Sequence, residues 1–403
     1  MKKENSKYGL PEKVIFCKKC VISNQRPSSS VEIKSSNPFN KKGISFEEDG
    51  ICSACKFHDE KEKNINWKQR EEELLILLDK YRKNDGSYDV VVPGSGGKDS
   101  SFTAHILKYK YGMNPLTVTW APHLYTEIGW ENFTNWMHVG GLDNLLYTPN
   151  GNLHRLLTKL AFKNLLHPFQ PFIIGQRLIG PSIASKFGIN LVMYGENQAE
   201  YGNNVEENKT PKMKNEYFST QSKDSIYLSG LSVKEIIDNY KFTLNDFVPY
   251  FPINTGVFEN LKINYQYLGY YLKWDPQECY YYASENTGFK ANIERTEGSY
   301  SKYSSIDDKT DPFHYYTTLI KFGLGRSSYD ASQEIRNEKI TREEGIALVK
   351  KYDQEFPKKY FKEFLEYISL DESEFWDIID QFRPPHLWIK ENNEWRLKHT
   401  VHS

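Results

Sequence analysis

The sequence predicts an α/β protein with a doubly wound parallel sheet, preceded by a small cysteine-containing module and followed by a mostly helical region. Short apolar, β-branched runs alternate with amphipathic helical patterns from residue 88 to residue 194, as in sheets whose parallel strands are connected by helices. Two C-x-x-C pairs precede this alternation, and beyond residue 314 the apolar residues recur almost only at helical spacing. The expected divisions are 1–62, 63–225 and 226–403.

The charge balance argues against nucleic acid and membrane partners. The 403 residues include 52 Lys and Arg against 53 Asp and Glu, so the net charge is close to zero. Binding to a nucleic acid backbone requires a basic surface, which this balance does not predict. No run approaches the length of an apolar membrane span, and residues 1–13 lack the apolar core of a signal peptide. We therefore expect a cytoplasmic protein.

Four of the five cysteines form two C-x-x-C pairs: Cys17 with Cys20, and Cys52 with Cys55. Two such pairs supply the four thiolates of a tetrahedral Zn²⁺ site. Disulfides are not expected without a secretion signal. A redox role would require a βαβ setting, which residues 1–59 lack. The pattern therefore favours structural zinc in an otherwise irregular module.

Residues 88–101 combine a buried strand, a glycine turn and the beginning of a helix. Backbone N–H groups at the start of a helix attract anions, and glycines let the backbone approach phosphate oxygens closely. The Walker pattern fails here, because Val92 stands where it requires glycine and Asp99 follows Lys98. The dinucleotide pattern G-x-G-x-x-G also fails. The alternative to a phosphate loop is an ordinary turn before a helix.

The sequence Ser-Gly-Gly-Lys-Asp-Ser, residues 95–100, resembles the pyrophosphate loop of the ATP pyrophosphatases, which cleave ATP between its α and β phosphates. GMP synthetase, asparagine synthetase and tRNA thiolation enzymes belong to that family, whose fold is of the adenine nucleotide α-hydrolase type. A carboxylate in a phosphate loop is best explained as a Mg²⁺ ligand. The expected ATP-binding residues of the loop are Ser95, Gly96, Gly97, Asp99 and Ser100, and Ser95, Lys98 and Asp99 are the expected catalytic residues.

The predicted strands are 88–92, 115–120, 144–147 and 190–194. The predicted helices before and between them are 67–83, 99–111, 129–139, 153–166 and 170–187. Ligands of such sheets bind beyond the carboxyl ends of the strands, so we expect residues 95–100, 120–123, 148–150 and 196–197 to surround one crevice.

Three further groups are candidates for that crevice. In the loop family the adenine lies against the end of the second strand, which nominates Thr119 and Trp120 through their backbone. Glu196 and Asn197 are candidates for a second Mg²⁺ ligand or a substrate contact, with an ordinary loop as the alternative. Arg177 suits a carboxylate or phosphate, although a solvated helix face explains it equally well.

After residue 201 the alternation stops. Residues 202–225 are polar and without periodicity, and are predicted to form a lid. Residues 321–326, Lys-Phe-Gly-Leu-Gly-Arg, are a basic break between helices that could hold a triphosphate or an acidic substrate, or could be a plain turn. The helices predicted in this region are 232–240, 275–282, 315–322, 328–337, 341–352, 357–368 and 371–382.

The order of these motifs resembles the N-acetyl sugar amidotransferases of surface-polysaccharide (lipopolysaccharide, nonulosonic acid) and flagellin-glycan biosynthesis. The motifs are the first C-x-x-C pair, residues 50–55, the loop, residues 194–197 and residues 322–326. The resemblance implies that ATP, with Mg²⁺, adenylates the acetamido group of a sugar. Ammonia then replaces the oxygen and gives an acetamidino sugar. Some loop relatives use cysteines for sulfur transfer, which is the alternative role of the four cysteines.

Ammonia would have to come from another protein. Glutaminases use an activated cysteine at residue 2 or in a glycine-flanked elbow. Residue 2 is Lys, and Cys279 lies between Glu278 and Tyr280. The resemblance therefore implies a separate glutaminase subunit as a partner. The rival functions are a tRNA-modifying enzyme of the thiolation or lysidine type and a zinc-bearing interaction protein with a degenerate loop.

Overall fold

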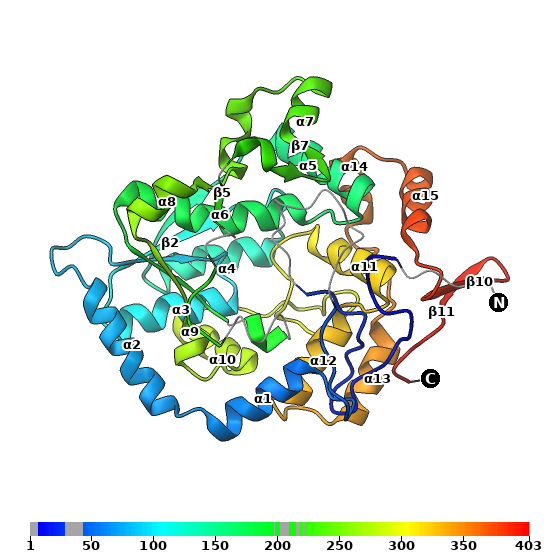
Figure 1. The fold of residues 1–403 in the computed structure, drawn as a ribbon, viewed down its shortest axis with the longest axis horizontal. Coiled ribbons are helices and arrows are strands. Elements are labelled where there is room, and N and C mark those ends of the chain that lie inside the picture. Colours follow the sequence, from blue (N-terminus) through cyan, green and yellow to red (C-terminus); the bar gives the residue numbers. More distant parts are fainter. Residues whose placement is uncertain are drawn as a thin grey trace.

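The centre of the protein is a sheet of five parallel strands (Figure 1). The computed structural model describes residues 7–28, 43–196, 198–201, 209–214, 218–220 and 222–402. In this part of the chain the strand order is β3-β2-β1-β4-β9, and every pairing in the sheet is parallel. The strands are β1 Val90–Pro93, β2 Pro115–Trp120, β3 Asp143–Tyr147, β4 Leu191–Tyr194 and β9 Asn264–Tyr267. The predicted doubly wound sheet is confirmed.

The order of the strands reverses between β1 and β4. The chain builds outward from β1 through β2 to β3, then returns to place β4 on the other side of β1. Val91 of β1 accordingly pairs with Leu116 on one side and Val192 on the other. The two chain connections leave β1 and β4 in opposite directions, which opens a crevice beyond their carboxyl ends. This reversal therefore positions the site.

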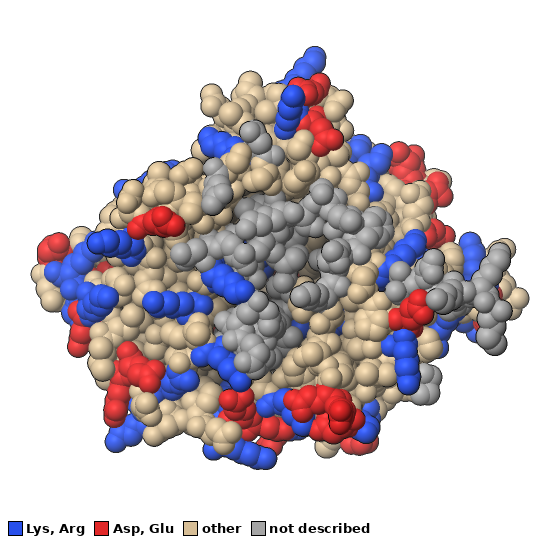
Figure 2. All heavy atoms as spheres, viewed as in Figure 1, with Lys and Arg blue, Asp and Glu red and all other residues tan. Residues whose placement is uncertain are grey.

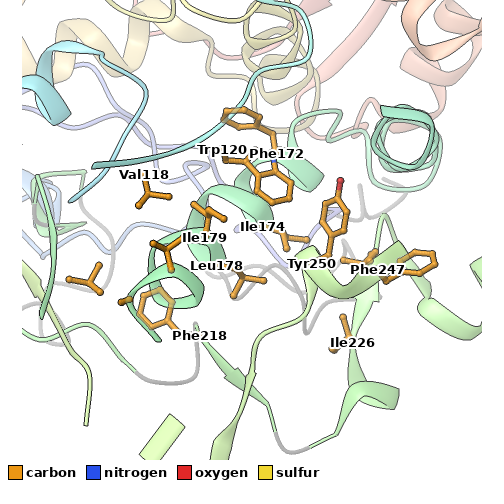
Figure 3. Packing of buried hydrophobic residues seen from close by; sticks show 14 of the residues in the cluster. Val118, Trp120, Phe172, Ile174, Leu178, Ile179, Phe218, Ile226, Phe247 and Tyr250 are labelled. Carbon is orange, nitrogen blue, oxygen red and sulfur yellow. The ribbon is translucent and has the colours of Figure 1, made fainter. Parts of the chain in front are cut away.

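Helices cover both faces of the sheet, which is why the strands β1, β2 and β4 are mostly apolar and buried. The helices of this region are α3 Lys98–Tyr109, α4 Glu127–His138, α5 Gly151–Leu165 and α6 Gln170–Phe187. Val91 belongs to a cluster with Val118 and α6, whereas its neighbours Val90 and Val92 belong to the cluster of the opposite face with α3. Figure 3 shows Val118 and Trp120 beside Phe172, Ile174, Leu178 and Ile179 of α6.

The cysteine module is more regular than predicted. Helix α1, Ser53–Asn64, begins directly after Cys52 and carries the chain to α2, Trp67–Tyr81. Ala54, Cys55 and Phe57 of α1 are buried, so the second cysteine pair lies on the packed face of a helix. The helix contains too few apolar residues for their spacing to indicate a helical period in the sequence.

Beyond β4 the structure adds elements to the sheet before it becomes helical. Strand β9 comes from an aromatic stretch for which no strand was predicted. It joins the central sheet although it follows residue 225, where the second domain was predicted to end. The domain boundaries themselves stay predictions. The remaining helices of eight or more residues are α10 Pro276–Thr287, α11 Asp311–Phe322, α12 Arg326–Arg336, α13 Arg342–Tyr352, α14 Phe361–Ile368 and α15 Glu372–Phe382. The shorter elements are β5 Ser219–Thr220, β6 Tyr227–Leu228, β7 Leu231–Ser232, α7 Val233–Asn239, β8 Ile253–Asn254, α8 Thr255–Leu261 and α9 Leu268–Tyr271.

The chain closes with an unpredicted hairpin of β10, Trp388–Glu391, and β11, Glu394–Leu397. Much of the predicted lid, 202–225, lies outside the described residues. On the face in Figure 2 the described basic and acidic side chains are interspersed. Among the described helices, none has the length and apolar character needed to cross a membrane.

Candidate functional site

The loop after β1 has the predicted strand–turn–helix geometry. Gly94 donates its N–H to the Val118 carbonyl at 3.0 Å, and Gly97 is the N-cap of α3. Gly96 has a φ of +81°, and a Cβ there would lie 2.8 Å from the Cα atom of Phe133. Only glycine fits this position without strain. The loop therefore ends at the positive end of the α3 dipole, which is a site for an anion.

Lys98 and Asp99 occupy the first turn of α3. The Lys98 ammonium lies 2.5 Å from Oδ2 of Asp99, whereas Oδ1 of Asp99 is buried and has no hydrogen-bond partner among the described residues. Burial alone would lower the pKa of Lys98, but the charges of Asp99 and Glu196 hold it above its ordinary value. A carboxylate oxygen without a partner beside an anion site is available to a divalent cation.

Three cavities meet at Asp99. The largest, of 530 Å³, is lined by residues that include Ser95, Ser100, Arg177, Glu196 and His314. A second, of 260 Å³, is lined by residues that include Lys98, Glu196, Asp275, Asp330 and Lys339. The third, of 170 Å³, is lined by residues that include Ser95, Asn132, Asp307 and Arg326. A crevice is thus present beyond β1 and β4, lined by residues of the segment 95–100 and by Glu196, whereas residues 120–123 and 148–150, which were expected around it, line none of the three cavities.

The glycine-rich break after α11 directs Arg326 to this crevice. Gly323 ends α11 with a φ of +67°, and a Cβ on Gly325 would lie 2.3 Å from the Asp353 carbonyl. Arg326 then begins α12 and lines two of the three cavities. Its Nε donates to Asp330 at 3.1 Å. Burial would lower the pKa of Arg326, but the nearby carboxylates, that of Asp330 foremost, raise it.

Lys321, the other cation of this break, points elsewhere. It is buried, and its ammonium donates to the Leu165 carbonyl at 3.0 Å. Of the two cations in the predicted basic break, Arg326 is the one that lines the crevice.

Asp307, which was not among the predicted site residues, lies against the loop of residues 95–100. Thr126 donates its N–H to the Asp307 carbonyl at 3.1 Å, and a Cβ on Gly129 would lie 2.4 Å from the Asp307 Cα. The Asp307 carboxylate accepts a hydrogen bond from Ser95, and burial raises its pKa. No periodicity or motif surrounds residues 306–308, so nothing in the sequence indicated this approach.

The remaining candidates have different positions. Glu196 and Arg177 line the largest cavity, and Asn197 lies outside the described residues. Thr119 and Trp120 are buried and line none of the three cavities, because the Trp120 indole packs against Tyr147 and helix α6. Their assignment to the adenine stays a prediction.

The four cysteines form one buried cluster, with their Sγ atoms all within 4.8 Å of one another. The Sγ–Sγ distances are 4.0 Å for Cys17 and Cys55 and 3.8 Å for Cys20 and Cys52. A tetrahedral Zn²⁺ site with Zn–S bonds of about 2.3 Å has edges of roughly 3.8 Å. The amide of Cys52 also donates to Cys17 Sγ at 3.3 Å. The cluster therefore fits zinc, and none of the four cysteines forms a disulfide.

The fold and the site define a parallel α/β protein with a glycine-rich loop at its topological switch point and a buried Cys₄ cluster that fits a metal ion. Residues 297–402 match the family model described as "LPS biosynthesis protein WbpG-like, C-terminal domain". The resemblance to proteins of surface-polysaccharide biosynthesis is confirmed over that part of the chain. No curated protein matches the chain.

Among solved structures, the chain has some likeness to the NMN synthetase from Francisella tularensis. The identity is 13%, the TM-score is 0.26, and the match covers 57% of this chain and 90% of the synthetase. A likeness at this score carries no argument about the site.

Proposed function

We propose that this chain is an ATP-dependent enzyme of surface-glycan biosynthesis that converts the acetamido group of a sugar into an acetamidino group. One observation carries the proposal. Arg326, within the segment matched to an LPS biosynthesis domain, lines the same cavity as Ser95 and Asp99 of the phosphate loop. A glycan-related segment and an ATP loop that share a cavity are what a sugar-activating enzyme requires.

The reaction needs activation because an amide oxygen is a poor leaving group. Transfer of AMP from ATP to the acetamido oxygen gives an O-adenylyl imidate and releases pyrophosphate. Ammonia then forms the C–N bond, and AMP departs with the electron pair of the C–O bond. No covalent enzyme intermediate is needed, so positioning and charge stabilisation account for the rate.

The residues of the crevice divide these tasks. The loop N–H groups and the Ser95 and Ser100 hydroxyls would hold the leaving pyrophosphate, with Lys98 and Arg326 adding positive charge. Mg²⁺, held by Asp99, would supply further charge neutralisation on the phosphates. The polar 260 Å³ cavity beside the loop, with hydroxyl, amide and carboxylate groups, has the chemistry that a sugar requires.

We further propose that a separate glutaminase subunit delivers the ammonia. Cys279 is 2% exposed, and burial raises the pKa of its thiol, so it is poorly suited to attack glutamine. The purified chain should convert its acetamido sugar with ATP and high ammonium and should ignore glutamine, and Cys279→Ala should leave this activity unchanged. Efficient use of glutamine by the isolated chain would contradict the split arrangement.

The test of the main proposal is pyrophosphate and AMP release across a panel of acetamido sugars, free and nucleotide-linked, with ammonium present. We expect release with at least one sugar and none with the matching sugar that lacks the acetamido group. Release that depends on tRNA instead would favour the modifying-enzyme alternative. Release with neither, while the protein remains folded, would favour a binding protein.

A further inference from the structure

The cysteine module reaches the cavity in front of the phosphate loop through Arg26. This residue follows the metal ligand Cys20 by six positions and is only 6% exposed. It lines the 530 Å³ cavity together with Ser95, Gly97 and Ser100 of the loop. A side chain from the first 28 residues and the phosphate loop therefore face the same space.

The position of Arg26 is fixed by the module. Its N–H donates to the Ser23 carbonyl at 3.2 Å, and its own carbonyl accepts the Ile44 N–H at 2.8 Å. A Cβ on Gly43 would lie 2.6 Å from the Asn24 carbonyl, so the second segment of the module lies close against the first. The main chain of Arg26 is thus held from both sides.

The module also contacts α12, which begins with Arg326, and the following helix α13. Arg342 of α13 donates to the carbonyls of Cys17 and Cys20, each at 3.2 Å. The Arg26 guanidinium lies 5.3 Å from the ring centre of Tyr329 on α12. Tyr329 lines both the 530 Å³ and the 260 Å³ cavities, whereas Arg26 lines the first of them.

The charges around the cavities indicate what Arg26 would bind. Arg177 of α6 lines the same 530 Å³ cavity, so two guanidiniums, which always carry charge, border the space in front of the loop. Among the described residues, the carboxylates that line this cavity are those of Asp99, whose Oδ2 is paired with Lys98, and Glu196. In the 260 Å³ cavity, by contrast, five carboxylates face three cations: Asp99, Glu196, Asp275, Asp330 and Glu334 against Lys98, Arg326 and Lys339.

We propose that Arg26 is a substrate-binding residue that contacts the phosphate groups of a nucleotide lying across the loop. The cysteine module then contributes a side chain to the binding site as well as stability to the fold. The proposal deepens the function proposed above and rests on it for the choice of nucleotide. That nucleotide is either ATP or a nucleotide-linked sugar, because both present the same phosphate chemistry to a guanidinium.

Calorimetric titration of Arg26→Ala and Arg26→Lys tests the proposal, with ATP, pyrophosphate and a uridine-diphosphate acetamido sugar as ligands. We expect Arg26→Ala to bind at least one of them about tenfold more weakly, since one charge-assisted contact is lost. Arg26→Lys should recover part of that loss as a point charge. The control is Arg396→Ala, whose side chain on β11 is 60% exposed.

Zinc content and melting temperature are measured on the same samples. Weakened binding of ATP and pyrophosphate identifies ATP as the ligand, and weakened binding of the sugar nucleotide alone identifies the sugar. Unchanged affinity for all three ligands overturns the proposal. So does loss of zinc or a lowered melting temperature in Arg26→Ala, because the role is then structural. Sugar-dependent pyrophosphate release by the unaltered chain tests the proposed function separately.

Discussion

Lys61 and Glu200 form an ion pair in the protein interior, with the ammonium 3.1 Å from both carboxylate oxygens. Lys61 is 1% exposed and also donates to the Trp274 carbonyl at 3.1 Å. Arg336 of α12 donates a hydrogen bond to the Glu200 backbone carbonyl at 2.9 Å. Its positive charge also acts to lower the pKa of the Cys20 thiol. The pair therefore connects the cysteine module, the segment after β4 and the C-terminal helices.

Lys61→Met should destabilise the protein by about 3–5 kcal/mol, because it leaves a buried carboxylate without its partner. Denaturant unfolding measures the loss. The double variant Lys61→Met with Glu200→Leu should recover much of it. The matched surface pair is Lys273 with Glu62. Lys273→Met should lower the unfolding free energy by less than about 1 kcal/mol. Equal losses for the two lysines would contradict the burial argument.

Asp99→Asn should abolish formation of AMP while leaving the melting temperature close to that of the unaltered chain. The substitution removes a negative charge from a partly exposed side chain in the first turn of α3 and nearly conserves the shape of that side chain. Lys98→Ala should cost less activity, since the loop N–H groups remain. Chromatographic quantification of AMP and ADP decides the matter: near-normal AMP formation by Asp99→Asn, or release of ADP by the unaltered chain, would refute the assignment.

Gly96→Ala and Gly97→Ala are adjacent substitutions with different expectations. Gly96 has a φ of +81°, which strains any other residue, and a Cβ there would lie 2.8 Å from the Phe133 Cα atom. We therefore expect Gly96→Ala to lower the unfolding free energy by at least about 1 kcal/mol. A Cβ on Gly97 meets nothing closer than 3.7 Å, so Gly97→Ala should lower the stability of the protein only slightly, through the weaker N-cap that alanine provides. Thermal unfolding compares the two, and a tolerated Gly96→Ala would mean that the loop can relax.

Asp308 makes the stability depend on pH. Burial raises its pKa to about 7 from 3.8, although Oδ1 accepts hydrogen bonds from the N–H and hydroxyl of Thr310. The folded state then binds a proton that the unfolded state has released, so stability falls as pH rises from about 4 to about 7. Between about pH 5 and pH 7.5 this group alone should cost about 2 kcal/mol.

Asp308→Asn keeps the Oδ1 acceptor and cannot ionise. We expect its unfolding free energy, measured with denaturant at several pH values, to decline less over this interval. The exposed Asp377→Asn serves as the control. An unaltered pH profile in Asp308→Asn would show that another group accounts for the dependence.

Metal analysis should find about one zinc per chain. Cys52→Ser should remove the metal and, with it, solubility and thermal stability, because the four ligands come from two segments of the chain and metal binding adds to the free energy of folding. Zinc-free protein that unfolds at the same temperature as the zinc-bound form would contradict a structural role.

Local pattern was sufficient for the elements whose stability is largely local. The four predicted strands are present because buried β-branched runs of this length have few alternatives. Strand β9 was missed although Asn264-Tyr265-Gln266-Tyr267 alternates polar and aromatic residues, because four residues are too few for the alternation to distinguish a strand from the rest of an aromatic stretch. Gln266 is nevertheless buried, accepting a hydrogen bond from the Tyr271 hydroxyl at 2.7 Å. The sequence does not predict that the Tyr271 hydroxyl becomes the hydrogen-bond partner of Gln266, because this contact forms only in the folded protein.

The sequence by itself determined the parts of the site that are contiguous in the chain. The loop of residues 95–100 and the two C-x-x-C pairs have chemistry that depends on neighbours a few positions away, so their spacing predicts their geometry. Only the tertiary structure decided that Arg26, Asp307 and Arg326 face that loop. Each comes from a separate segment, and their convergence depends on how the module, the sheet and the C-terminal helices pack, which no local pattern encodes.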